Sequence, residues 1–106
     1  MDYPITTSTK DNNRIVIRNY YIHNITIPAG FKTNGANVPR IFWSIIPPFK
    51  PKYEPAYIVH DYLCNLERYK YADEKFKDIL LEIEDSIITR AMVLAVTLYH
   101  RIKYGA

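Results

Sequence analysis

The chain has 106 residues, the length of one domain, and we expect residues 1–106 to fold as a single unit. Hydrophobic residues make up 48% of the chain and charged residues 24%, proportions that exclude wholesale disorder. The net charge is +3, from 14 basic and 11 acidic side chains scattered along the chain, which is no strong signal for nucleic-acid binding. The single cysteine, Cys64, excludes an intramolecular disulfide and favours a reducing compartment. We expect no membrane span and no signal peptide, because the apolar runs are short and the N-terminus is acidic.

The first third of the chain predicts strands. Residues 14–18 are rich in β-branched side chains, and residues 20–27 place apolar side chains at alternate positions. This pattern fits a hairpin or meander, and a single long bent strand fits nearly as well. Residues 31–33 can add a short strand before Asn34-Gly35, a turn-forming dipeptide. We therefore expect a small antiparallel sheet of two or three strands.

Prolines at five positions predict an irregular middle over residues 34–55, with one or two helical turns at 40–46. Helical spacing of apolar residues then predicts three helices, over 56–66, 73–83 and 86–103. The order of the elements, strands first and helices second, predicts the α+β class.

The predicted helices carry two further expectations. The short connection between the first two helices makes them an antiparallel helix hairpin. The third helix is apolar around most of its circumference, so we expect it to be buried on most sides. Leu80 and Leu94 should both belong to the core.

One set of residues suggests chemistry: His60-Asp61 in the first helix and Asp73 at the expected start of the second. Antiparallel packing brings Asp73 near His60, where a carboxylate can hold one ring nitrogen and leave the other to act as a base. Asp61 points about 100° further round the helix, where it can bind a cation. The alternative is a buried structural pair, with Asp73 acting as a helix cap. His23, His100 and Cys64 are weaker candidates.

Three segments with a characteristic order and spacing resemble a known family. They are Gly30-Phe31-Lys32-Thr33-Asn34-Gly35-Ala36-Asn37-Val38-Pro39-Arg40, His60-Asp61-Tyr62-Leu63, and Arg68 with Ala72-Asp73-Glu74-Lys75-Phe76. Over residues 10–105 the chain resembles the small proteins grouped as domain of unknown function family 1353. The chain departs from the family pattern at Asn34, where the family usually has Asp, and at Cys64, where a Tyr is common. The resemblance implies a phage or prophage origin, in the host cytoplasm or the phage virion, and implies no established activity.

A more distant resemblance is to the core of phospholipase A2 enzymes. It implies that His60 is the general base, that Asp73 orients it, and that Asp61 holds calcium with Asn34 and Gly35 of the loop. The disulfides of the secreted enzymes have no counterpart here.

Three functions remain open from the sequence. The favoured one is a non-catalytic phage protein, a virion or tail component or a host-interaction factor, whose partners are other phage proteins or a host protein. The second is a calcium-type metal-assisted hydrolase of ester or phospholipid substrates. The third, nucleic-acid binding through residues 68–71 and the C-terminal basic residues, is disfavoured by the low net charge. An open pocket at His60 favours the enzyme, and a sealed one favours the structural pair.

Overall fold

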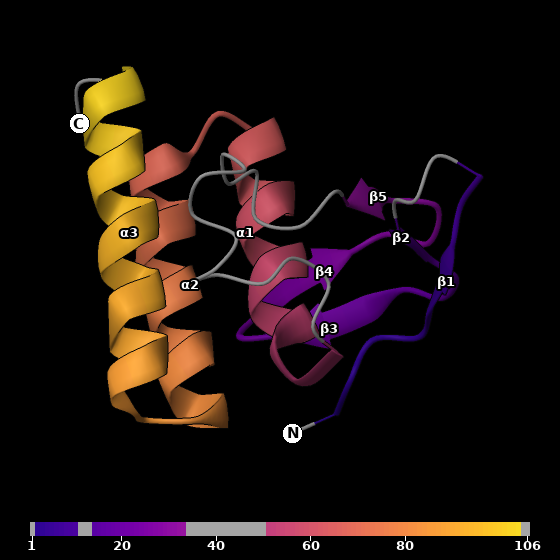
Figure 1. Ribbon diagram of the computed structural model, residues 1–106. Coiled ribbons are helices and arrows are strands. Elements are labelled where there is room, and N and C mark those ends of the chain that lie inside the picture. The colour runs from indigo at the N-terminus through magenta and orange to yellow at the C-terminus, as the bar shows by residue number, and fades with distance from the viewer. Residues whose placement is uncertain (1, 11–13, 34–50, 105–106) are drawn as a thin grey trace.

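The strands lie in the first third of the chain and the helices follow residue 51, as the α+β prediction requires (Figure 1). The computed structural model describes residues 2–10, 14–33 and 51–104, so the segment expected to be irregular up to residue 50, with its helical turn at 40–46, lies outside the described residues. The strands are β1 (Thr6–Ser8), β2 (Arg14–Val16), β3 (Tyr20–Ile22), β4 (Ile25–Ile27) and β5 (Lys32–Thr33). The helices are the 3-10 turn η2 (Pro51–Tyr53), α1 (Glu54–Asn65), α2 (Tyr69–Ile83) and α3 (Ile87–Tyr104).

The expected small antiparallel sheet is present as three strands in the order β1-β2-β5. The expected pairing of residues 14–18 with 20–27 was wrong, because β3 and β4 pair with each other as a separate hairpin. Its two-residue turn is His23-Asn24, and both residues have positive φ, 49° and 62°. Two positive φ angles are the requirement of the type I′ turn, which joins antiparallel strands tightly. Histidine is an unusual first residue there, which is why the sequence pattern did not reveal the turn.

Helix α1 begins at Glu54, two residues earlier than predicted. Pro55 lies in its first turn, where proline is tolerated because the missing N–H has no partner inside the helix. The N–H of Glu67 donates to the carbonyl of Cys64, and the N–H of Arg68 donates to that of Leu63. With Glu67 at φ 59°, these two bonds form a Schellman C-cap. The cap turns the chain within three residues, so α2 begins at Tyr69 rather than at residue 73.

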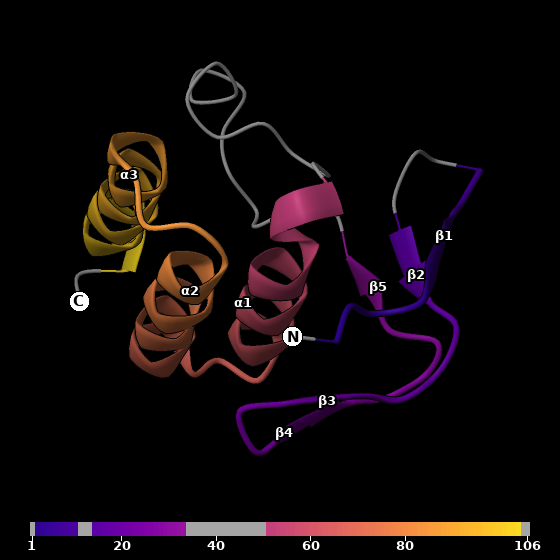
Figure 2. The ribbon, with the colours of Figure 1, turned by 90° about the horizontal axis from the view of Figure 1, so that it is seen from below.

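The elements form layers in the order strands, α1, α2, α3 (Figure 2). The core lies between the strands and the first two helices, and its fully buried side chains include Ile27, Tyr57, Ile58, Phe76, Ile79 and Leu80. Tyr57 and Phe76 stack across the α1–α2 interface with ring centroids 6.1 Å apart. Within the residues described, no helix is both long enough and apolar enough to cross a bilayer.

Helix α3 is the outermost layer and packs on α2 (Figures 1 and 2). Among the α3 side chains that the structure describes, the deeply buried ones are Thr89, Met92 and Val96, which share one face of the helix. The expectation that α3 is buried on most sides was therefore wrong, and Leu94, expected in the core, is 59% exposed. Leu80 is fully buried, as expected.

Candidate functional site

His60 and Asp73 meet across the α1–α2 interface. His60 Nε2 lies 2.8 Å from Asp73 Oδ1, a hydrogen-bonding distance. A carboxylate accepts hydrogen bonds, so in the neutral imidazole this contact places the proton on Nε2. The predicted contact is thus present, but Asp73 lies in the second turn of α2, so it is not a helix cap. The pair joins two neighbouring helices.

The imidazole of His60 is enclosed by protein. Its side chain has no exposed surface, while that of Asp73 is 16% exposed. The ring of Phe76 meets the imidazole at an interplanar angle of 61°, with centroids 5.2 Å apart. Cys64 Sγ lies 3.8 Å from Nδ1 and 3.9 Å from Nε2. The thiol of Cys64, one helical turn after His60, therefore lies against the imidazole.

Asp61 contacts the sheet at Thr33, the last residue of β5. Thr33 Oγ1 donates a hydrogen bond of 2.6 Å to Asp61 Oδ2, and Thr33 is almost fully buried. Thr33 precedes Asn34 in the chain, so Asp61 is anchored beside the point where the predicted loop begins. Asn34 and Gly35 themselves lie outside the described residues.

The described part of the chain holds only Asp61 of the calcium ligands that the phospholipase A2 resemblance implies. Calcium takes six to eight oxygen ligands in its usual sites. In residues 2–10, 14–33 and 51–104 no three His, Cys, Asp or Glu side chains are grouped to hold a metal ion. Asp61 supplies one carboxylate, and one of its oxygens already accepts the threonine hydroxyl.

A groove between α2 and α3 was not predicted from the sequence. It has a volume of about 680 Å³, and Asp73 forms part of its wall together with Leu81, Val93 and Leu94. The carboxylate of Asp73 therefore stands between the enclosed imidazole and this groove. The sequence did not reveal the groove because it depends on which face α3 turns toward α2.

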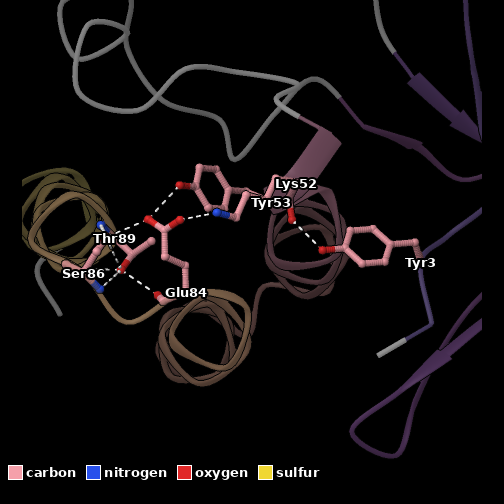
Figure 3. Close-up of polar contacts among 6 residues, drawn as sticks. All are labelled: Tyr3, Lys52, Tyr53, Glu84, Ser86 and Thr89. Carbon is pink, nitrogen blue, oxygen red and sulfur yellow. Dashed lines mark hydrogen bonds and ion pairs between the residues drawn. The ribbon is translucent and has the colours of Figure 1, made fainter.

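Glu84, just after α2, is the centre of a second polar cluster (Figure 3). Its carboxylate accepts hydrogen bonds from Tyr53 Oη at 3.1 Å and Ser86 Oγ at 2.7 Å, and it pairs with the ammonium of Lys52. These bonds, the lysine contact first, lower the pKa of Glu84 to about 2. The backbone N–H of Ser86 donates to Thr89 Oγ1, and the backbone N–H of Thr89 donates to Ser86 Oγ. These two hydrogen bonds cap α3. The cluster thus holds η2 against the α2–α3 connection.

Of the two remaining histidines, the structure describes the surroundings of His23. His23, expected on a strand, lies in the hairpin turn, with Nε2 2.8 Å from Glu82 Oε2 on the surface of α2. The side chain of His100 lies outside the described residues.

Comparison with known proteins identifies a family and no activity. Residues 12–96 match the family described as "Protein of unknown function (DUF1353)". A relative from Sinorhizobium fredii, "Uncharacterized protein y4jT", is 46% identical over 39 residues. That match covers 36% of this chain and 12% of the relative, so the chain spans a small part of the relative's length. No solved structure matches the chain.

Proposed function

The chain belongs to the DUF1353 family, whose description names no activity. From the geometry we propose that the protein acts by binding another protein and is not an enzyme. In this proposal it is a phage- or prophage-encoded component of the particle, or a factor that contacts a host protein. The His60–Asp73 pair then joins α1 to α2. The observation that carries the proposal is the complete burial of His60.

Burial matters because a general base must reach the proton that it removes, directly or through one water molecule. The surroundings of the imidazole include Asp73, the ring of Phe76 and the thiol of Cys64. A carboxylate partner together with complete burial is what a structural polar pair requires. An open catalytic pocket would expose part of the ring.

Nucleic-acid binding through residues 68–71 is disfavoured by a local contact. The guanidinium of Arg68 lies 4.6 Å from the centroid of the Tyr71 ring, and the ammonium of Lys75 lies 5.8 Å from it. These cation–π contacts use the aromatic surface that a base would stack on.

The second candidate is the metal-assisted hydrolase, and one observation favours it. The Nε2–carboxylate contact of 2.8 Å is the arrangement in which an aspartate fixes a histidine tautomer for catalysis. This candidate requires a motion that uncovers the imidazole, for example at the wall formed by Asp73.

Hydrolysis assays separate the two candidates. Purified protein is incubated with short- and long-chain nitrophenyl esters and with phospholipid vesicles, with and without millimolar calcium. We expect no turnover above that of buffer. Turnover that is lost in His60→Gln and Asp73→Asn, and kept in the matched surface variant His23→Gln, would overturn the proposal.

The binding half of the proposal needs a separate measurement. Mass spectrometry of purified phage particles, and crosslinking in the producing host, should find the protein in the particle or joined to one defined protein. If the protein is absent from particles and yields no reproducible crosslink while it is expressed and folded, the binding function is wrong.

A further inference from the structure

Helix α3 presents an aliphatic face that nothing in the described structure covers. Its side chains are strongly exposed: Ile87 by 87%, Ile88 by 58%, Leu94 by 59%, Leu98 by 46% and Ile102 by 84%. Single exposed aliphatic residues are ordinary, but several on one helix that also adjoins a groove are typical of an interaction surface. Leu94 belongs to both the exposed face and the groove between α2 and α3.

The groove is lined by both apolar and charged side chains. Leu81, Val93 and Leu94 supply the apolar part of the lining. Lys70 and Lys77 come from α2, and Arg90 and Arg101 come from α3. The lining therefore combines aliphatic and basic side chains from both helices.

The charges of the lining favour an anionic occupant. Two of the six charged side chains already have a partner. Asp73 contacts His60, and Arg90 pairs with Asp85 at 2.8 Å between Arg90 Nε and Asp85 Oδ1. The other four make no ion pair in the described part of the chain. They are the cations Lys70, Lys77 and Arg101 and the carboxylate of Glu74.

The length of the groove matches a short helix. Its lining runs from Tyr69 to Leu81 on α2 and from Arg90 to Arg101 on α3. At a rise of 1.5 Å per residue, these spans are roughly 16–18 Å long, about three helical turns. A helix that lays one apolar stripe into such a groove is a common mode of peptide recognition.

We propose that the groove between α2 and α3 binds an acidic amphipathic helix of a partner protein, with the partner's aliphatic stripe on Leu81, Val93 and Leu94 and its carboxylates beside the lysines. This proposal rests on the binding function proposed above and names its surface. A nucleic acid fits less well, because its phosphates gain nothing from aliphatic side chains. A second copy docked groove to groove would bring like charges together.

A designed peptide provides the test. The probe is a labelled helix of about 14 residues, with leucines at i, i+3 and i+7 and glutamates beside them. One control peptide replaces the glutamates by lysines, and another scrambles the order so that the apolar stripe is lost. Fluorescence anisotropy gives the Kd, and backbone amide spectra locate the contact. Of the three peptides, we expect only the acidic amphipathic one to bind. It should shift the backbone amide signals of α2 and α3.

Two variants and two matched controls locate the interaction. Lys77→Glu and Leu94→Asp should each weaken binding of the acidic peptide by about tenfold or more, which is about 1.4 kcal/mol. Lys10→Glu makes the same charge change on the strand side, and Ile17→Asp introduces a carboxylate at a site that is 49% exposed. Both controls should leave the Kd unchanged. Unchanged melting temperatures confirm that all four variants are folded.

Several results would overturn the inference. One is no binding of the acidic peptide, and another is binding that Lys77→Glu and Leu94→Asp leave unchanged. Binding to anionic vesicles but not to the peptide, lost in Leu94→Asp, would assign the surface to lipid. Dimerisation that Leu94→Asp abolishes would assign it to a second copy. Ester hydrolysis together with peptide binding would overturn only the proposal that the protein is not an enzyme.

Discussion

Two histidine–carboxylate pairs of the same length allow the role of His60 to be measured. His60–Asp73 and His23–Glu82 both join Nε2 to a carboxylate oxygen at 2.8 Å. The first pair has side-chain exposures of 0% and 16%, and the second has 27% and 52%. A double-mutant cycle to alanine on each pair isolates the interaction from the cavity that each single substitution leaves. The two cycles therefore differ mainly in burial.

The structure sets the expected coupling energies. A buried hydrogen bond to a charged group contributes about 1.5–3 kcal/mol, and the partial exposure of Asp73 favours the lower half of that range. An exposed pair contributes about 0.2–1 kcal/mol because water screens it. For a chain of this size, about 1 kcal/mol changes the melting temperature by roughly 4–8 °C. The two cycles should thus be distinguishable.

Urea unfolding at one pH, followed by circular dichroism, gives the free energy of unfolding for each variant. The m-value should stay constant across both cycles, which shows that the same surface unfolds. A coupling energy for His60–Asp73 no larger than that for His23–Glu82 would refute the structural role of the buried pair. It would also revive the hydrolase, because an open site tolerates the loss of its polar partner.

Three further predictions concern the fold and the metal. Leu80→Ala should cost about 2–5 kcal/mol of unfolding free energy and Leu94→Ala less than about 0.5 kcal/mol, because only the first side chain is buried; equal costs in denaturant titrations would contradict this. The pKa of Glu84 is lowered from 4.5 to about 2 in the folded protein, so its stabilisation is complete above pH 4.5 and is lost as the pH falls toward 2. Glu84→Gln should flatten the pH dependence of the melting temperature in that window, and an unchanged slope would count against the cluster. Millimolar calcium should leave the melting temperature unchanged, because Asp61 is a single carboxylate that already accepts a threonine hydroxyl; a rise that Asp61→Asn abolishes would contradict this.

Local patterns in the sequence were sufficient for the fold class and for one contact of the site. Apolar spacing predicted the three helices, because a helix with a buried stripe repeats every 3.6 residues whatever it packs against. The short connection after Asn65 then placed α1 and α2 side by side, and the contact of His60 with Asp73 followed from that arrangement. The beginning of α2 was missed because Glu67 forms a left-handed cap without the glycine that usually marks one.

What the tertiary structure decided is how each surface is used. The sequence of α3 is aliphatic on most sides, but α3 is the outermost layer (Figure 2). Met92 is therefore buried on one face, and Leu94 is exposed on the opposite face. Likewise, the sequence His60-Asp61 does not distinguish a catalytic histidine from a buried structural one. The zero exposure of the His60 side chain, with Phe76 of α2 against the ring, shows that His60 is enclosed. Burial depends on residues distant in the chain, and therefore no local pattern could reveal it.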